Sequence, residues 1–282
     1  MAVIDSHHHF WDPDRGDYPW MVGRMAMIRR PFGPSDLAPV LSDCGVSRTV
    51  VVQTWSSLEE TREFLNVAAD TDFVAGVVGW VDLTDPNVAV TIHDLRTSPH
   101  GRYLVGIRHQ VHDEPDADWL LRPDVDRGIS AVGEAGLVYD LLVRPRELPA
   151  ALTLAQRHRD TTFVIDHIAK PDIAHHESSE WSASMARFGK LSNVHCKLSG
   201  MVTEADWSAW KPRDLQPYVD RVLEWFGPRR VMYGSDWPVC LVAASYRQVF
   251  DALAECIHDL STGDRSQILG ANAARVYQVP EG

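Results

Sequence analysis

The sequence has few cysteines, and none of them forms a closely spaced pair. Its 282 residues include four, which are widely spaced and sit in apolar stretches: Cys44, Cys196, Cys240 and Cys256. No CxxC motif is present. This cysteine usage is typical of a reduced protein and predicts a cytoplasmic location.

Long apolar runs and an excess of positive charge are also missing. No stretch approaches the roughly 20 apolar residues that a membrane helix needs, and no basic segment followed by a long apolar one stands at the N-terminus. The 39 acidic residues outnumber the 27 basic ones, and the formal charge of −12 disfavours binding to nucleic acid or an anionic membrane. We therefore expect a soluble, unexported protein without nucleic-acid or membrane partners, and its oligomeric state stays open.

Motifs for nucleotide cofactors and for nucleophilic serines are absent as well. No glycine-rich loop matches a P-loop or a GxGxxG fingerprint, so no nucleotide cofactor is expected. No GxSxG elbow occurs, and Ser235 stands between Gly234 and Asp236 in a different pattern. Water is therefore the expected attacking group.

Short β-branched or apolar runs alternate with segments of helical period along the whole chain. Eight strands are expected, near Val3 to Ser6, Thr49 to Gln53, Phe73 to Trp80, Tyr103 to His109, Leu137 to Leu142, Thr162 to His167, Val194 to Ser199 and Arg230 to Asp236. Eight such units in about 250 residues predict an α/β fold, a closed (β/α)8 barrel, with an open doubly wound sheet as the alternative. No linker or repeat divides the chain, so one domain over residues 1–282 is expected.

The connections that leave the expected strands are long and rich in Trp, His and charge, whereas those that enter them are short. Because barrel enzymes elaborate the loops that follow their strands, the long connections should form one functional face. The connection over residues 11–34 is a candidate lid over this face, with packing against a neighbouring subunit as the alternative.

The segment Asp5-Ser6-His7-His8-His9 can place two imidazoles on one face of a strand. Side chains alternate across a strand, so His7 and His9 point the same way. Two neutral imidazoles at the end of a buried strand suit a divalent metal or a proton-transfer site. A tag remnant is a poor explanation, because the run contains only three consecutive histidines and Phe10-Trp11 follow it directly.

Ionisable residues stand at four further expected strand ends: Arg108, His167, Lys197 and Asp236. Alternation directs Arg108 inward, where it needs an acidic partner or a substrate oxygen. Asp236 beside imidazoles can accept a proton from water, and a metal there would lower the pKa of that water. Each also has a structural explanation: an ion pair for Arg108, a turn cap for Asp236 and a satisfied core residue for His167.

Several of the ten tryptophans lie at or beyond expected strand ends, where flat rings can stack on a sugar. Others belong to the core. The residues expected to bind substrate are Arg108, Lys197, Trp80, Trp237 and Tyr139.

These motifs together resemble the amidohydrolase superfamily. The matching segments are Asp5 to His9 as D-x-H-x-H, Asp166-His167 with Lys170-Pro171, and Gly234-Ser235-Asp236-Trp237-Pro238. Other segments are similar to the sugar lactonases of the amidohydrolase-2 branch, fuconolactonases above all; they include Tyr18-Pro19-Trp20, Arg108-His109-Gln110, Val138-Tyr139-Asp140 and Cys196-Lys197-Leu198-Ser199-Gly200. The similarity spans nearly the whole chain and implies a closing helix within residues 261–282.

The resemblance implies a set of metal ligands: His7, His9, His167 and Asp236. Binuclear members also need a bridging carboxylated lysine or a glutamate and a second later-strand histidine. Here Tyr139-Asp140 stands where that histidine is expected, and Lys197 is on too late a strand to be the bridge. One divalent ion, zinc by its imidazole and carboxylate ligands, or none is therefore implied.

The function implied is hydrolysis of a sugar aldono-lactone, similar to L-fucono-1,5-lactone, to the aldonate, with a place in fucose catabolism. Asp236 would deprotonate water and His167 would protonate or orient the leaving alkoxide, both as catalytic residues. Arg108, Lys197 or a metal would stabilise the oxyanion. Two alternatives stay open: metal-dependent decarboxylation by the same ligands, and a noncatalytic sugar-binding barrel.

Overall fold

Eight parallel strands form a barrel in the computed structural model, which describes residues 2–176 and 179–280. The strands pair in chain order: β1 (Val3–His8), β2 (Val46–Val52), β3 (Val74–Gly79), β4 (Leu104–His109), β5 (Val138–Leu141), β6 (Phe163–Ile165), β7 (Val194–Leu198) and β8 (Val231–Tyr233). The first and last strands meet just beyond β8. There the backbone N–H of Asp236 donates to the His7 carbonyl oxygen at 2.8 Å, and the backbone N–H of His9 donates to the Trp237 carbonyl oxygen at 2.7 Å. The predicted (β/α)8 barrel is thus confirmed, and the open sheet was the wrong alternative.

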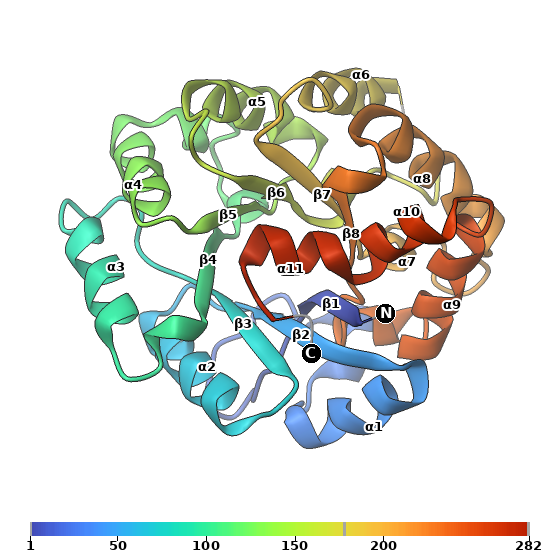
Figure 1. Cartoon of the computed structure of the whole chain (residues 1–282), viewed down its shortest axis with the longest axis horizontal. Coiled ribbons are helices and arrows are strands. Elements are labelled where there is room, and N and C mark those ends of the chain that lie inside the picture. Colours follow the sequence, from blue (N-terminus) through green and yellow to red (C-terminus); the bar gives the residue numbers. More distant parts are fainter. Residues whose placement is uncertain (1, 177–178, 281–282) are drawn as a thin grey trace.

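Helices surround this barrel, as Figure 1 shows. They are α1 (Pro34–Cys44), α2 (Leu58–Asp70), α3 (Val88–Thr97), α4 (Pro123–Glu134), α5 (Leu148–Arg157), α6 (Ser179–Phe188), α7 (Met201–Glu204), α8 (Pro212–Phe226), α9 (Tyr246–Cys256), α10 (Thr262–Ser266) and α11 (Asn272–Tyr277). In α2 the Ser57 hydroxyl accepts the N–H groups of Glu59 and Glu60, and the inner face buries Phe64 and Leu65. No helix of the described residues is long and apolar enough to cross a membrane.

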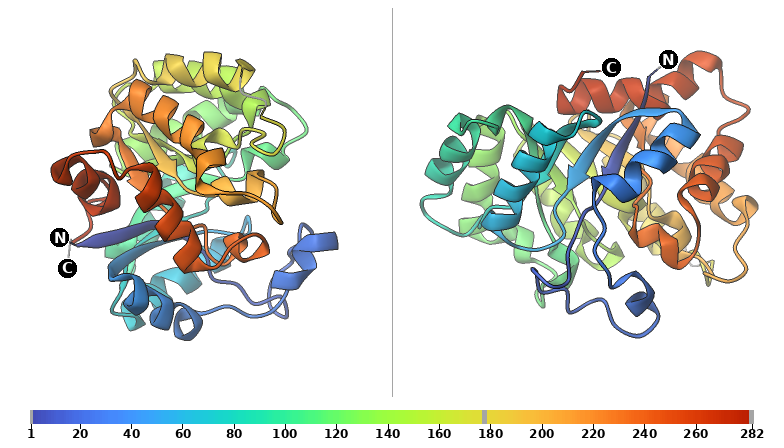
Figure 2. Two further views of the ribbon diagram at one scale, coloured as in Figure 1. Left: turned by 90° about the vertical axis from the view of Figure 1, so that its right-hand side faces the viewer. Right: turned by 90° about the horizontal axis from the view of Figure 1, so that it is seen from below.

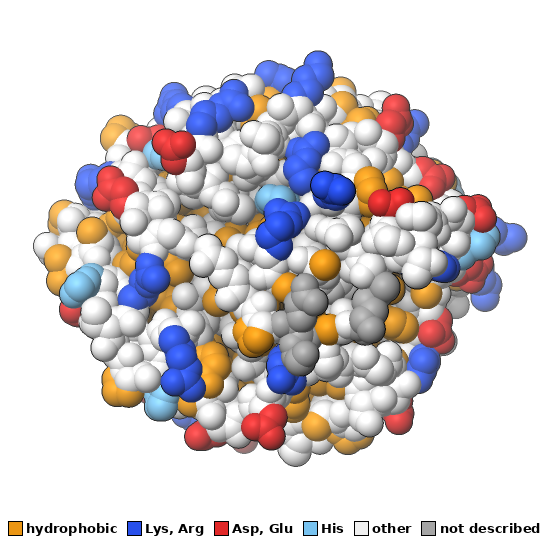
Figure 3. Space-filling model, in the orientation of Figure 1, with side chains coloured by type: hydrophobic (Ala, Val, Ile, Leu, Met, Phe, Trp, Pro, Cys, Tyr) orange, Lys and Arg blue, Asp and Glu red, His pale blue; other side chains and the backbone are white. Residues whose placement is uncertain are grey.

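The C-terminal segment closes one end of the barrel. A π-helical turn, Gln267–Ala271, joins α10 to α11, and α11 lies across the barrel centre in Figure 1. Ala273 and Tyr277 pack on apolar side chains inside the barrel, Ile4 and Met232 among them. Figure 3 shows this end in space-filling form, filled at its centre. Residues 281 and 282 of the expected closing segment lie outside the described residues.

The connection over residues 11–34 projects from the other end of the barrel, away from both termini (Figure 2). Its base is closed by two backbone hydrogen bonds between Trp11 and Phe32, at 3.1 and 2.9 Å. Farther along, the Arg24 guanidinium lies 4.6 Å from the centre of the Trp207 ring, which belongs to the connection after β7. The first and seventh connections therefore meet over the barrel mouth.

Candidate active site

Loops at the carboxyl ends of the strands enclose a pocket of about 360 Å³. This volume lies in the range of small-molecule sites. Its lining includes His9, Trp20, Met25, Arg108, Gln110, His112, Arg144, His167, Lys170, Glu204, Trp207, Asp236 and Val239. Four residues singled out from the sequence thus meet here, and they come from the first, fourth, sixth and eighth strand ends: His9, Arg108, His167 and Asp236.

His7 and His9 lie together at the end of β1, as side-chain alternation predicts. The Nδ1 of His9 is 2.7 Å from the Val52 carbonyl oxygen, so it carries the ring proton and donates it. The other nitrogen, Nε2, then bears a lone pair; it lies 3.2 Å from His7 Nε2 and 3.3 Å from Asp236 Oδ1. The lone pairs of His9 Nε2 and Asp236 Oδ1 lie 3.3 Å apart, and a metal ion bound by both atoms would suit this arrangement.

The charge states of the histidines and of Asp236 also favour a metal ion at this position. Burial lowers the pKa values of His7, His9 and His167, so their imidazoles are neutral near neutral pH. Burial would raise the pKa of Asp236, but the adjoining His167 and His9 outweigh it and hold that pKa below its ordinary value. Neutral imidazoles around a carboxylate are a donor set that zinc-type ions bind.

A strained turn positions His167. Four consecutive non-glycine residues, His167 to Lys170, have φ between 48° and 59°, where each costs about 1–2 kcal/mol. Such strain persists where surrounding structure enforces it, typically at functional sites. Ser199 Oγ lies 2.9 Å from His167 Nδ1, and a Cβ on Gly200 would lie 2.5 Å from the same atom. Only glycine therefore fits beside the His167 ring.

Asp236 also has a positive φ, 56°. The Asp5 side chain holds the backbone of its neighbour Ser235 in place. The Asp5 carboxylate accepts the backbone N–H of His7 at 3.1 Å and that of Ser235 at 2.8 Å. A Cβ on Gly234 would lie 2.7 Å from His7 Cβ, so the missing side chain lets β8 approach β1. The first residue of the D-x-H-x-H motif thus joins the two strands that carry His7 and Asp236.

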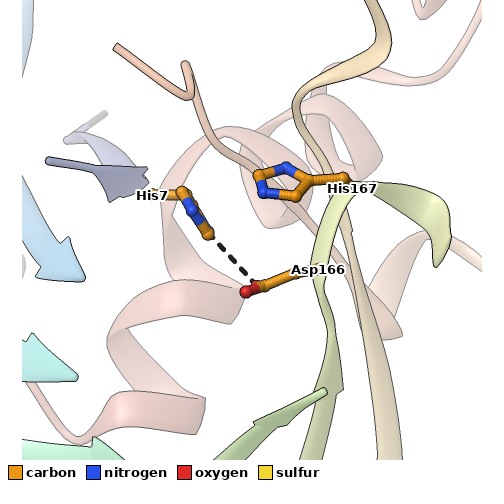
Figure 4. Close-up of side chains that lie close together, drawn as sticks. All are labelled: His7, Asp166 and His167. Carbon is orange, nitrogen blue, oxygen red and sulfur yellow. Dashed lines mark ion pairs between the residues drawn. The ribbon is translucent and has the colours of Figure 1, made fainter. Parts of the chain in front are cut away.

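The second nitrogen of His7 faces a different group. Its Nδ1 lies 3.2 Å from Asp166 Oδ1, and the His167 ring is centred 4.4 Å from the His7 ring (Figure 4). Two sets of potential ligands therefore share His7: His7, His9 and Asp236, and His7, Asp166 and His167.

Beneath these ligands lies a layer of buried charges. Lys197 Nζ is 2.5 Å from Asp140 Oδ2, 3.0 Å from Asp166 Oδ1 and 3.2 Å from His7 Nδ1. Arg108 donates through NH1 to Asp166 Oδ2 at 3.0 Å and through NH2 to the Gln53 carbonyl oxygen. Lys197 is therefore part of a charge network below the pocket and not of its lining.

The remaining sequence-predicted substrate residues also lie away from the pocket lining. Tyr139 is fully buried and packs edge-to-face on Phe163. Trp237 packs in the core against Phe32, with ring centres 5.3 Å apart. Trp80 donates its indole N–H to His109 Nδ1 at 3.0 Å.

Of the described residues that line the pocket, two have a buried polar atom without a protein partner: Arg108, which the sequence singled out, and His112, which it did not. Arg108 Nε and His112 Nδ1 are buried and make no hydrogen bond within the described residues. An unpaired buried donor costs free energy that a polar ligand can recover. Lys170 Nζ lies 2.5 Å from Glu204 Oε1, and both line the pocket. His112 lies in a connection whose length and composition mark it as functional, but nothing in the pattern distinguishes it from its neighbours.

The fold and the His/Asp cluster at the barrel mouth define a protein of the amidohydrolase class. The amidohydrolase family model matches residues 4–279, and the chain belongs to this family. It is 41% identical to the L-fucono-1,5-lactonase of Burkholderia ambifaria, with 98% of this chain and 95% of the relative covered. It is 38% identical to the L-fucono-1,5-lactonase of Burkholderia multivorans, with 99% and 96% covered. A zinc-bound amidohydrolase structure from B. multivorans superposes with a TM-score of 0.94 at 37% identity, covering 99% of this chain and all of that one.

Proposed function

We propose that this protein hydrolyses a sugar 1,5-lactone, of the L-fucono-1,5-lactone type, to the open aldonate. The observation that carries the proposal is the Asp236 carboxylate in a polar pocket that His9, Arg108 and His167 also line. The similarity to two L-fucono-1,5-lactonases over nearly the full chain supports the substrate class.

The proposed metal ligands are His7, His9 and Asp236, the set whose atoms converge from β1 and the end of β8. Zinc is the proposed ion, since its preferred ligands are imidazole and carboxylate. When bound, such an ion supplies a Lewis acid that lowers the pKa of water towards neutrality.

Asp236 is the proposed base. Its low pKa keeps it ionised at neutral pH, so it can accept the proton that the attacking water loses. Attack on the lactone carbonyl places negative charge on its oxygen, and the Arg108 guanidinium, which lines the pocket, is the proposed cation that stabilises this oxyanion.

His167 is the proposed hydrogen-bond donor to the leaving alkoxide, and the proton that Asp236 takes from water is the one that completes the new hydroxyl group. Its Nδ1 can accept a hydrogen bond from the Ser199 hydroxyl, which places the ring proton on Nε2 at the pocket side. A nitrogen that carries a proton cannot ligate a metal, so this role separates His167 from the three proposed ligands.

The pocket walls suit a hydroxylated ring. Trp20, Met25 and Trp207 supply apolar surface for a ring face, and His112 and Lys170 supply polar groups for hydroxyls. We propose that these residues, together with Arg108, contact the substrate.

The test is acid release from a panel of aldono-1,5- and 1,4-lactones, followed with a pH indicator and corrected for spontaneous opening. We expect enzyme-dependent acid release, fastest for 6-deoxy-hexono-1,5-lactones. Carbon dioxide release from hydroxybenzoic acids, with no acid from any lactone, would instead establish the decarboxylase alternative. Lactone binding without turnover would establish the binding barrel.

A further inference from the structure

One ion pair belongs to the lining of the pocket and keeps both of its side chains partly accessible. Lys170 ends the strained turn after β6, where its backbone N–H donates to the His167 carbonyl oxygen at 2.8 Å. Glu204 is the last residue of α7, in the connection after β7. Lys170 Nζ lies 2.5 Å from Glu204 Oε1, and the two side chains are 13% and 15% exposed. Two connections thus place opposite charges side by side in the pocket wall.

Two lysines of the site differ in how many hydrogen-bond donors they have left. A lysine ammonium carries three N–H donors. Lys197 Nζ is fully buried and lies within 3.2 Å of acceptor atoms from three other residues, so its donors are all engaged. Among the described residues, Lys170 Nζ has a single hydrogen-bond partner, Glu204. Lys170 therefore has donors to offer to a ligand, whereas Lys197 has none.

The Glu204 carboxylate has an acceptor left as well. Its Oε1 atom accepts the hydrogen bond from Lys170, whereas Oε2 accepts none from the described residues. Oε2 is also not one of their buried side-chain atoms that lack a partner, so it is accessible to solvent. The pair therefore presents N–H donors and a carboxylate acceptor next to each other.

The two connections are held together without this ion pair. The backbone N–H of Ala174, which lies in the same connection as Lys170, donates to the Glu204 carbonyl oxygen at 3.0 Å. This bond depends on neither charged side chain. An ion pair in contact with water adds little to stability, because water screens the charges. A structural role thus gives no reason for both side chains to line the pocket, whereas a role towards a ligand does.

Two neighbouring hydroxyls of a sugar ring match the donors and the acceptor of this pair. A hydroxyl can accept a hydrogen bond from an ammonium and donate one to a carboxylate. Hydrogen bonds with a charged partner are stronger than those between neutral groups. A ring carbon that lacks its hydroxyl would leave the facing charge without this partner, and a site built in this way discriminates strongly against such a ligand.

We propose that Lys170 and Glu204 are a specificity-determining pair that binds two adjacent hydroxyls of the lactone ring, with Lys170 as donor and Glu204 Oε2 as acceptor. The inference rests on the proposed function and narrows the substrate class to lactones that carry a vicinal diol. Because Lys170 and His167 belong to the same turn, the pair also fixes the ring relative to the leaving oxygen to which His167 donates.

The experiment measures kcat/KM for acid release from L-fucono-1,5-lactone and from its 2-deoxy, 3-deoxy and 4-deoxy analogues. The full-length proteins compared are the wild type, Lys170→Met and Glu204→Gln. The matched control is Asp124→Asn, which breaks an ion pair with Arg122 at the start of α4, outside the pocket lining. Circular dichroism verifies the fold of each variant.

We expect each of the two pocket variants to lower kcat/KM for the parent lactone roughly 10- to 100-fold, because each removes a hydrogen bond with a charged partner. On the analogue that lacks the hydroxyl facing the substituted residue, the same variant should differ from wild type by less than about threefold, because the interaction is already missing. The two analogues identified in this way should lack hydroxyls on adjacent carbons. Asp124→Asn should match the wild type on all four lactones.

Equal losses on all four lactones would overturn the proposal, because they would show that the pair supports the pocket and binds no hydroxyl. A wild type that hydrolyses every analogue as fast as the parent lactone, or variants that identify hydroxyls on non-adjacent carbons, would overturn it too. If Glu204→Gln does not fold, Glu204→Asp, which withdraws the carboxylate, provides the same comparison, and the wild-type panel decides alone if both fail. No acid release from any lactone would overturn the proposed function together with this inference, whereas release with equal losses overturns the inference alone.

Discussion

The two ends of the barrel interior differ in the chemistry of their inward side chains, although the same eight strands form both. At the end that α11 covers, inward side chains are apolar, such as Ile4, Val50 and Met232, and they pack as an ordinary core. At the other end the inward side chains are ionisable, and Lys197 and Asp166 are fully buried there. One end of the barrel therefore stabilises the fold, while the other holds buried charge and backbone strain of the kind found at functional sites.

Removing the metal should have the largest effect, and only at the charged end. We expect dialysis against a chelator to lower kcat for lactone hydrolysis roughly 100- to 10,000-fold, because the chemistry that the proposed metal ion would supply is then lost. Zinc should restore the rate, and near-ultraviolet circular dichroism should change little. Full activity of a protein shown to be metal-free would contradict a role for a metal ion in the hydrolysis.

Truncation in the apolar end should affect stability instead of turnover. Met232 is fully buried against the α11 side of the barrel, so Met232→Ala should cost about 2–5 kcal/mol of unfolding free energy. Urea denaturation measures this cost. The kcat of the folded fraction should stay within about twofold of wild type, and a collapse of kcat would show that the two ends are not independent.

The pH dependence of stability should report on His195, which lies on β7 near the α11 end. Burial, with Arg275 and Arg230 nearby, lowers its pKa from 6.5 to about 4. Below pH 6.5 the unfolded state therefore binds a proton that the folded state does not, so stability is lost as pH falls. This proton accounts for about 2 kcal/mol between pH 7 and pH 5.

His195→Gln should remove that contribution and leave the pH dependence of the other histidines. Urea unfolding of both proteins at pH 7 and pH 5 provides the comparison. An identical loss of stability in wild type and variant would show that His195 is not the group responsible.

The smallest expected effect concerns the loop over the mouth. Arg24 lies over the Trp207 ring and has an exposed side chain, so Arg24→Ala should cost at most about 1 kcal/mol of stability. If the contact helps to cover bound substrate, KM should rise severalfold with kcat unchanged, and Arg24→Lys should recover part of the loss. Equal KM values in all three proteins would mean that the loop does not respond to substrate.

The sequence predicts the barrel well because apolar strands alternate with helices and each strand end is marked by a change in composition. It also predicts that His7 and His9 share a face and that Arg108 points inward, since both follow from the two-residue period of a strand. These inferences depend only on local geometry, which a sequence encodes directly.

Long-range packing decides the rest. Trp237 and Tyr139 look like substrate contacts at strand ends, yet neighbouring aromatic rings enclose them in the core. The contact from Tyr277 to Asp140 joins residues 137 positions apart, and no periodicity indicates it. The left-handed turn at His167 to Lys170 carries no glycine that would mark it in the sequence.

The most direct test of the account is the rate of acid release from L-fucono-1,5-lactone by Asp236→Asn beside the wild type, both loaded with zinc. Asparagine keeps the size of the side chain but cannot take a proton from water. We expect kcat to fall roughly 100- to 10,000-fold in Asp236→Asn, with lactone still bound. A variant that retains wild-type turnover would contradict it.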